Sequence, residues 1–237
     1  MSAVTLHVAP SPSFHRQGAI IHCLAFSNSP ISRWFATTPA DAITDREDQI
    51  APFRLSRLTR EYAHREFQPG VVQVFALIDG RVVGCAIWGL PKHLYRSETL
   101  VELIYRKGIE CKNNIEDWMF PSNWYLPERV KKFRDTQEEV MERLLGPVKK
   151  DETWYLKILI VHPEFQRRGV GTALLDWGLA HARGRGENVY LEASDRGEPL
   201  YLKKGFKELG HLVVGEEGHE ASLPCLLWDP PPAPIVN

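Results

Sequence analysis

A short segment, residues 166–172, holds two adjacent arginines and then two glycines spaced by one residue, in the order QRRGVGT. It comes after an apolar run, residues 154–161, and opens a stretch with helical character. A loop between a strand end and a helix start presents unpaired backbone N–H groups and the positive end of the helix dipole. Such a loop favours an anion, above all a phosphate. Gly169 and Gly171 would let that anion approach the backbone closely, and Arg167 and Arg168 would add charge-assisted hydrogen bonds.

Two common phosphate loops fit this segment poorly. A Walker loop ends in Gly-Lys-Ser/Thr, whereas Gly171 is followed directly by Thr172. A dinucleotide loop needs G-x-G-x-x-G immediately after its strand. Here the residues HPEFQRR intervene, and the position of the third glycine is Leu174. A dinucleotide-binding oxidoreductase is therefore the weakest functional alternative.

The whole stretch resembles the acyl-CoA-binding signature of the GNAT acetyltransferase superfamily. The core of that signature is Gln/Arg-x-x-Gly-x-Gly/Ala, which corresponds to residues 166–171. A second stretch, residues 201–206, resembles the motif Tyr-x-x-x-Gly-Phe that closes the following helix in this family. The resemblance covers roughly residues 154–210 and implies acetyl-CoA as cosubstrate.

The resemblance also implies where acetyl-CoA binds. The amides of residues 167–172 would hold the CoA pyrophosphate, and backbone groups of the preceding strand would pair with the pantetheine arm. The expected cofactor-binding residues are Leu159, Ile160, Val161, Gln166, Arg167, Arg168, Gly169, Val170, Gly171, Thr172 and Ser194. For Ser194, capping of the following turn is an equally good role.

Transfer of an acyl group to an amine needs a neutral nucleophile, a polarised carbonyl and a proton for the departing thiolate. A strand N–H within residues 159–161 is expected to polarise the carbonyl, as in an oxyanion hole. Tyr201 matches the tyrosine that points at the acyl sulfur in many relatives, which makes it the candidate general acid. The alternative is a helix tyrosine that packs against the sheet. Glu192, on the strand face opposite to Leu191 and Ala193, is the candidate general base, with a solvated surface glutamate as the alternative.

Other kinds of catalytic centre find little support. The four cysteines are widely scattered and do not pair at metal-ligand spacing, so no metal is expected. They also stand in no Cys-His-Asp pattern, which disfavours a covalent acyl-enzyme. His162, in the turn before Pro163, is expected to be structural.

The elements around these residues predict a fold of the α/β (α+β) class. The C-terminal half reads as strand, loop, helix, strand, helix and two strands, which indicates a mixed sheet with a parallel crossover. With the resemblance, this predicts a GNAT-like, mostly antiparallel twisted sheet flanked by helices. The expected upstream elements are a strand at 4–10, helices at 14–26 and 46–66, and a hairpin at 71–91 that turns at Asp79-Gly80. The expected downstream elements are a helix at 127–146, strands at 153–161, 188–194, 207–214 and 221–228, and helices at 171–183 and 198–205.

We expect one domain over residues 1–237, with a CoA-binding core at about 154–210 and an insertion at about 92–152. The insertion is too long for a structureless connection and should fold as helices. It contains acidic Glu116 and Asp117 and several aromatic residues: Tyr95, Trp118, Phe120, Trp124 and Tyr125. These side chains either line the acceptor site, with a carboxylate for an ammonium group, or form the small core of the insertion.

The composition is that of an ordinary globular protein. The formal net charge is −1, so nucleic acid and membranes are not expected partners. No segment predicts a signal peptide or a membrane span, which makes a cytoplasmic location the expectation. The leading functional prediction is direct acetyl transfer to a primary amine of a small molecule. Acetylation of a peptide or protein amine and a non-catalytic CoA-binding or sensing module are the alternatives.

The oligomeric state is left open by the sequence. The strand at 221–228 could be a sheet edge that pairs across a dimer. Its Pro224, however, argues against a long regular ladder.

Overall fold

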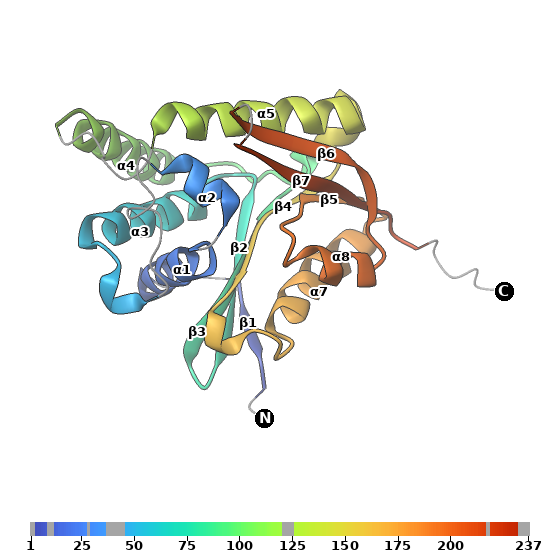
Figure 1. Ribbon diagram of the computed structural model, residues 1–237, viewed down its shortest axis with the longest axis horizontal. Helices are drawn as coiled ribbons and strands as arrows, with labels where there is room; N and C mark the ends of the chain where they lie inside the picture. The colour runs from blue at the N-terminus through green and yellow to red at the C-terminus, as the bar shows by residue number, and fades with distance from the viewer. Residues whose placement is uncertain are drawn as a thin grey trace.

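The computed structural model describes residues 3–8, 12–27, 29–36, 46–119, 126–216 and 219–231. Its centre is a seven-stranded sheet in the order β1-β2-β3-β4-β5-β7-β6 (Figure 1). The strands are β1 (Thr5–His7), β2 (Val71–Ile78), β3 (Arg81–Gly89), β4 (Trp154–Val161), β5 (Val189–Glu192), β6 (Lys207–Glu216) and β7 (His219–Trp228). All neighbouring strands are antiparallel except β4 and β5, which are parallel. The predicted mixed, mostly antiparallel sheet with a parallel crossover is therefore confirmed.

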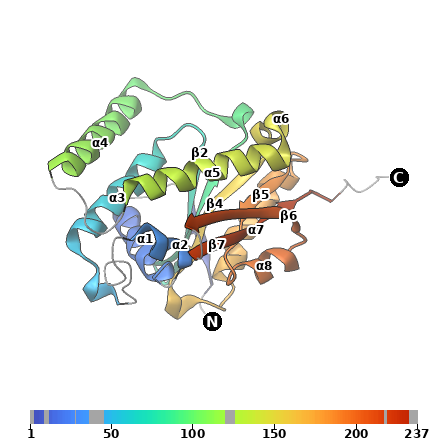
Figure 2. The same cartoon turned by 45° about the horizontal axis from the view of Figure 1, so that its top comes forward.

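Helices cover both faces of this sheet, as the prediction required. They are α1 (Pro12–Ala25), α2 (Pro30–Phe35), α3 (Pro52–Glu66), α4 (Leu100–Met119), α5 (Pro127–Leu145), α6 (Pro147–Asp151), α7 (Val170–Arg183) and α8 (Glu198–Lys203). One face carries α7 and α8; on the other face α1 and α3 cover β2 to β4, and α5 covers β6 and β7 (Figures 1 and 2). Short 3-10 turns lie at Glu47–Gln49, Lys92–Leu94 and Pro163–Phe165.

The hairpin forms where the sequence predicts it. Asp79 and Gly80 have φ values of 51° and 77°, and positive φ at both central residues is what a two-residue type I′ turn needs. The predicted helix at 46–66 starts later, at Pro52. Ala51 before it is extended, because the proline ring disfavours helical dihedrals in the preceding residue.

The largest core lies between the sheet and α7. Trp88 of β3 is fully buried there. A Cβ atom at Gly178 of α7 would lie only 2.2 Å from the Trp88 ring, so glycine at this position lets the helix pack over the tryptophan. The tight packing fixes α7, and hence the loop before it, against β3 and β4.

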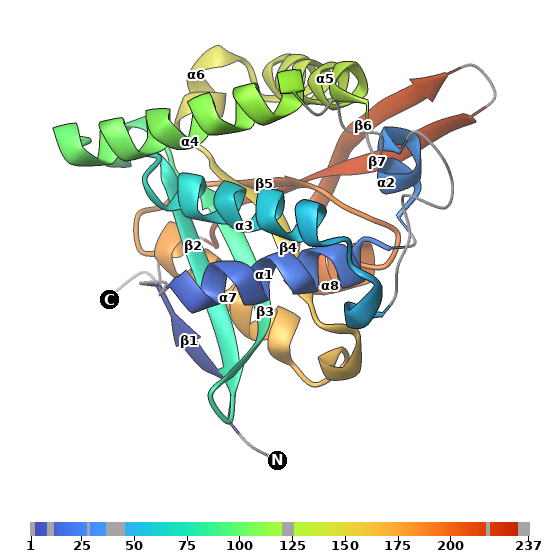
Figure 3. The same cartoon turned by 90° about the vertical axis from the view of Figure 1, so that its left-hand side faces the viewer.

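The insertion between β3 and β4 is helical in its described part, as predicted, and its segment at 127–145 forms the expected helix, α5. It adds α4, α5 and α6. Figure 3 shows α4 alongside α3, on the side of α3 that is away from α1. Phe120, Trp124 and Tyr125, which the insertion hypothesis also names, lie outside the described residues.

The suggestion that residues 221–228 form a sheet edge is wrong. This segment belongs to β7, which lies between β5 and β6. Pro224 has no N–H to donate to a neighbouring strand. It is tolerated because β5 ends at Glu192, just before the position that the proline nitrogen faces. The Pro224 carbonyl still accepts a hydrogen bond from the Ala193 N–H at 2.8 Å, and β6 pairs with β7 on both sides of the proline.

The described helices contain no segment with the length and hydropathy that a bilayer crossing requires. Within the same residues, no cluster of His, Cys, Asp or Glu is arranged to hold a metal ion.

Candidate active site

The glycine loop joins β4 to α7. Gly169 has a φ of 83° and is the N-cap of α7, with no side chain capping the helix. Arg167 also has a positive φ, 58°, so two left-handed residues flank Arg168. The first-turn amides of α7, at residues 170–172, have no partner within the helix. The loop thus presents several N–H groups at the positive end of a 14-residue helix.

The side chains around the loop suit an anion. Gln166, Arg167 and Arg168 are exposed, and the Arg168 guanidinium lies 5.1 Å from the centre of the Phe165 ring. His162 is buried, and its Nδ1 accepts a hydrogen bond from the Glu164 N–H at 3.3 Å. It therefore caps the 3-10 turn before the loop, in agreement with the structural role expected for it.

Next to this loop, β4 and β5 separate. The two parallel strands pair only at Trp154↔Val189 and Tyr155↔Tyr190, and β5 ends two residues later. Beyond Tyr155, β4 therefore has a hydrogen-bonded neighbour, β3, on one side only. The gap opens toward the glycine loop, since α7 starts close to the far end of β4.

A bulge in β4 sets the directions of its side chains beside this gap. The register with β3 shifts between Ile87 and Trp88, which leaves Lys157 as the extra residue of β4. Leu156 and Leu159 consequently both face α7, although three positions separate them, whereas Ile158 faces α1 and α3. Bulges redirect a strand in this way next to functional sites.

The backbone of β4 beyond the bulge alternates between its two edges. The His162 N–H bonds to the Val83 carbonyl of β3 at 2.8 Å. In an antiparallel ladder, the N–H and C=O of Ile160 then both point toward β3. The N–H and C=O groups of Leu159 and Val161 point toward the opposite edge of β4. The Gln166 side chain donates to the Val161 carbonyl at 3.2 Å, which agrees with this direction. Of the three expected positions, Leu159 and Val161 thus direct their backbone groups into the gap.

Tyr201 lies in α8, on the face of the sheet that carries α7. Its side chain is buried, with its ring 5.7 Å from that of Phe206. A Cβ at Gly171 would contact Leu159, Val161 and Leu200 at 3.5 to 3.7 Å, so α8 and the loop converge on the open part of β4. Burial raises the pKa of the Tyr201 phenol well above its usual value. The phenol therefore keeps its proton at neutral pH.

Ser194 is placed as a turn cap. Its Oγ accepts a hydrogen bond from the Gly197 N–H at 3.3 Å, and its carbonyl accepts from the N–H groups of Gly197 and Glu198. Its side chain is exposed. The hydroxyl proton still has no partner in these contacts, so capping and cofactor binding are compatible roles.

Glu192 lies on the opposite face of the sheet, under α5, and is not the solvated surface glutamate of the alternative. Its Oε2 accepts hydrogen bonds from the Tyr155 hydroxyl at 2.6 Å and from the Gln137 amide at 3.3 Å. Its Oε1 is buried, and the nearby Tyr190 hydroxyl approaches the carboxylate without good hydrogen-bond geometry. Burial raises the pKa of Glu192, and the hydrogen-bond donors oppose this rise only in part.

Lys157, the bulge residue, adds a positive charge on the same face. Its Nζ lies 5.9 Å from the centre of the Tyr155 ring. The pKa of this lysine is lowered mainly by desolvation and then by the charges of Arg65 and Arg134, whereas the charge of Glu138 raises it. The side chain of Lys157 is nevertheless exposed to solvent.

The acidic residues of the insertion do not contribute to this site. Asp117 forms a two-pronged ion pair with Arg57 of α3, at 2.6 and 3.1 Å, and Glu116 pairs with Arg60. The idea that one of them receives a substrate ammonium is therefore wrong for this structure, because both carboxylates attach α4 to α3. Trp118 is not part of an insertion core, since it is 82% exposed.

Two residues of the site are not predicted by the sequence. Tyr155 reads only as part of an apolar strand. Gln137 lies within the apolar stripe of α5 that includes Phe133, Val140 and Leu144. A polar residue at a position where helical spacing demands an apolar one is a recognisable signal. It could have identified Gln137, although not its partner.

Comparison with known proteins gives a consistent result. Residues 40–206 match the model of the Acetyltransferase (GNAT) family. A protein named "Acetyltransferase" from Stachybotrys chartarum is 31% identical over 138 residues, which make up 58% of this chain and 54% of that protein. The chain thus spans about half the length of this curated relative.

Solved structures share the fold. One is a histone acetyltransferase HPA2 and related acetyltransferase from Corynebacterium glutamicum, with a TM-score of 0.55, 20% identity and full coverage of both chains. Another is a polyamine N-acetyltransferase from Drosophila melanogaster, with a TM-score of 0.54 and 12% identity over 96% of this chain and 100% of that one.

Proposed function

The chain belongs to the acetyltransferase (GNAT) family, whose cosubstrate is acetyl-CoA, and we propose that it transfers the acetyl group directly to a primary amine of a small molecule. The observation that carries this proposal is the opening between β4 and β5. The anion loop and Tyr201 lie on one side of the sheet, and Glu192 lies on the other. An acyl donor and an amine could therefore meet at the gap from opposite faces.

The donor side fits acetyl-CoA. The uncapped first turn of α7 and the positive φ of Arg167 and Gly169 direct amides toward a single region, which suits a pyrophosphate. Arg167 and Arg168 are exposed and able to reach the same anion. We assign the pantetheine arm to the free edge of β4, where the backbone groups of Leu159 and Val161 would pair with its amides. Ser194 is assigned to the same cosubstrate through its hydroxyl proton.

Acetyl-CoA supplies a thioester, whose carbonyl carbon accepts the amine and whose C–S bond then breaks. The N–H of Leu159 or Val161 would stabilise the negative charge that develops on the carbonyl oxygen. Tyr201 would give its phenolic proton to the sulfur as the thiolate departs. Because the pKa of this phenol is raised, Tyr201 holds its proton at neutral pH until the thiolate forms, and it would regain a proton from solvent after CoA leaves.

Glu192 would take the proton from the attacking amine. Its raised pKa makes it a stronger base than an ordinary glutamate. Oε2 is held by Tyr155 and Gln137, so Oε1 is the atom left to accept the proton, directly or through water. Desolvation and then the charges of Arg65 and Arg134, which lower the pKa of Lys157, would act in the same way on an amine bound beside it. They would favour the neutral amine, which is the reactive form.

The first experiment measures free thiol released from acetyl-CoA with a panel of amines. The panel includes polyamines, because one fold relative acts on them, together with arylamines, amino acids, aminoglycosides and short peptides. We expect turnover with one small-amine class. Glu192→Gln should lower kcat by roughly 10²- to 10⁴-fold and Tyr201→Phe by about 10²-fold. The matched control is Tyr62→Phe, which removes another buried phenol, 0% exposed, in the core under α3.

Binding of acetyl-CoA is measured separately by calorimetry, so that the donor site is tested apart from the chemistry. Gly169→Ala should weaken binding about tenfold or more, because alanine is strained at positive φ. Gly186→Ala is the control, since Gly186 has a φ of 72° and, like Gly169, open space at its Cβ position. Equal binding by both variants would contradict the loop assignment.

The panel also separates the alternatives. Peptide turnover without small-amine turnover would favour a peptide acetyltransferase. A CoA-sensing module would be favoured by tight acetyl-CoA binding without any amine that accelerates thiol release. In that case Tyr201→Phe should change neither readout.

A further inference from the structure

Helix α4 is attached to the rest of the molecule by its polar face. Arg57, Arg60 and His64 of α3 contact Asp117, Glu116 and Glu110 of α4, and Arg60 also donates to Asn113 at 3.0 Å. Ile109 is the buried apolar residue of α4. An amphipathic helix normally turns its charged face to water and its apolar face to the core. Helix α4 has the reverse orientation.

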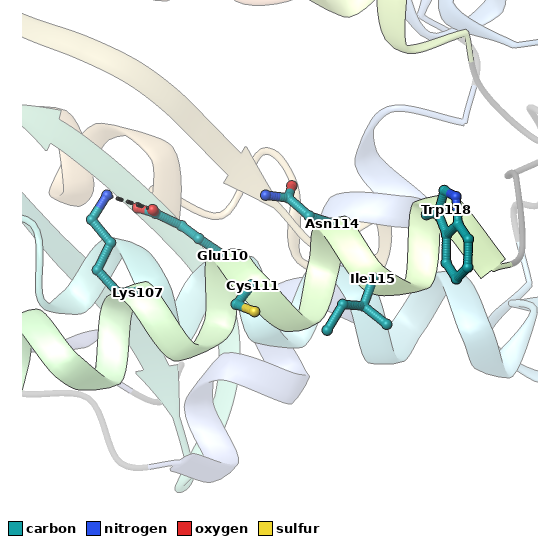
Figure 4. A pocket seen from close by; sticks show the side chains of 6 residues that line it. All are labelled: Lys107, Glu110, Cys111, Asn114, Ile115 and Trp118. Carbon is teal, nitrogen blue, oxygen red and sulfur yellow. Dashed lines mark hydrogen bonds and ion pairs between the residues drawn. The ribbon is translucent and has the colours of Figure 1, made fainter.

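The outward face of α4 carries an apolar stripe with alternating spacings of three and four residues. We define the outer stripe as Val101, Ile104, Gly108, Cys111, Ile115 and Trp118, all of which are exposed. Figure 4 shows part of it, with Cys111, Ile115 and Trp118 following one another along the helix beside Asn114 and the Lys107–Glu110 ion pair. A repeat of this kind is the heptad seam by which two helices pack. The pattern therefore points to another helix as the partner.

From this arrangement we infer that the outer stripe is a dimer interface, in which α4 packs antiparallel against α4 of a second copy of the chain. With the crossing point between Ile109 and Glu110, Val101 would lie against the partner's Trp118 and Ile104 against the partner's Ile115. Gly108 would meet the partner's Cys111. The bulky residues occupy the two ends and the small ones the middle, which lets the helix axes approach closely. A two-fold interface requires such a self-complementary surface.

The charges beside the stripe agree with this pairing. Tyr105 and Lys112 lie on one flank, and Lys107 and Asn114 on the other. In an antiparallel pair each flank meets the same flank of the partner, so Lys112 would lie nearest the partner's Tyr105 and Lys107 nearest the partner's Asn114. No lysine is forced against a lysine. A membrane-bound helix would instead need its charged face free for water and lipid headgroups, whereas that face of α4 is occupied by α3.

The exposed area is also sufficient. The large exposed apolar residues of α4 are Leu100, Val101, Ile104, Tyr105, Ile115, Trp118 and Met119, each at least half exposed. If a fully exposed large side chain offers about 150–250 Å², they expose on the order of 800 Å² together. That is about what one partner contributes to a standard interface, roughly 800 Å². A patch of this size is unusual on a monomer.

The test is the mass of the intact chain in solution, measured by sedimentation or light scattering at concentrations up to about 100 µM, where interfaces of this size associate. We expect a dimer. Ile115→Asp should weaken it at least about tenfold. Val148→Asp is the control, because Val148 is 70% exposed but lies on α6, outside the stripe. A wild-type monomer at every concentration would overturn the proposal, and so would a dimer that survives both Ile115→Asp and Trp118→Asp.

The helix direction is tested by cross-linking. In a Cys111→Ser background, Ile104→Cys and Ile115→Cys proteins are mixed and oxidised. An antiparallel pair should give a disulfide in the mixture only, because two copies of position 104 would lie about 16 Å apart along the axis, at about 1.5 Å per residue. Cross-linking of each variant with itself, and not in the mixture, would overturn the antiparallel arrangement.

Discussion

The two long helices of the insertion, α4 and α5, have similar lengths and similar amphipathic patterns but opposite relations to the rest of the molecule. Val140 and Met141 of α5 are buried against β5, β6 and β7, and Gln137 from the same helix reaches Glu192. Helix α4 binds α3 through ion pairs and leaves its apolar residues in water. One helix completes the sheet and the candidate active site, whereas the other offers a surface.

The comparison shows what an apolar stripe determines. Its period indicates a helix with two unlike faces, but not which face the protein will cover. For α5 the sheet beneath offers Tyr190, Leu212 and Leu227, which need an apolar cover. For α4 the helix beneath offers arginines, and Arg57 is only 8% exposed, so a carboxylate must come to it. The partner surface decides the orientation.

The largest expected effect is a difference in folding stability between a variant in the apolar stripe of α5 and a variant in the outer stripe of α4. Met141→Asp should lower the free energy of unfolding by about 3–5 kcal/mol, because it buries a charge in an apolar cluster. Ile115→Asp should change the stability of the monomer by less than about 0.5 kcal/mol. Urea unfolding of dilute protein measures both. Similar losses in the two variants would mean that the α4 stripe is buried within the monomer.

A smaller effect is expected where α4 is attached. Asp117→Ala leaves the buried guanidinium of Arg57 without its main partner and should cost about 1–3 kcal/mol. Hydrogen exchange should accelerate over residues 100–119 more than elsewhere. Asp135→Ala on α5 is the control, because its ion pair with Lys131 is largely exposed and such pairs contribute about 0–1 kcal/mol. Unchanged exchange in α4 would show that the ion pairs do not hold it.

The contributions of two carboxylates, Glu192 under α5 and Glu110 of α4, should respond to pH in opposite directions. The pKa of Glu192 is raised by burial, so the folded state binds its proton more tightly than the unfolded chain does. Wild type should therefore lose stability relative to Glu192→Gln as pH rises from about 4.5 through the raised pKa, by at most about 1.4 kcal/mol per pH unit. Glu110 of α4 has its pKa lowered to about 2 by Lys107 and then His64, so its contribution is lost as pH falls from about 4.5 toward 2.

Urea unfolding between pH 4 and pH 8 measures the first difference, and hydrogen exchange of α4 in acid measures the second. A stability difference between wild type and Glu192→Gln that stays flat with pH would contradict the buried carboxyl.

The smallest effect concerns the contribution of α5 to the chemistry. Gln137→Leu removes a hydrogen bond that lowers the pKa of Glu192. The acid limb of kcat/KM should move to higher pH, with less than about a threefold loss at alkaline pH. Asn113→Leu, which removes a hydrogen bond between α4 and α3, should leave the limb in place. If it moves the limb equally, the effect of Gln137 is not local.

The parts of the fold that could be predicted from sequence are those with local causes. The turn at Asp79-Gly80 follows from positive φ, and the loop before α7 from its two glycines. Pro127 and Gly146 mark the start of α5 and the residue just past its end. The sequence predicts a helical insertion but not the bounds of α4, because its stripe lacks comparable residues at its start and end. The buried state of Glu192 also escaped prediction, since strand alternation gives the face of a side chain but not what covers it.

For this protein the sequence by itself determined the anion loop, the order of strands and helices in the C-terminal half, and the family resemblance. Each depends on residues close together in the chain, whose backbone preferences and spacing act without distant partners. Only the tertiary structure decided that β4 and β5 separate beyond Tyr155, that α5 places Gln137 on Glu192, and that α4 turns its apolar face outward. These outcomes depend on contacts between segments far apart in the chain, where the shape and charge of one surface select what can cover it.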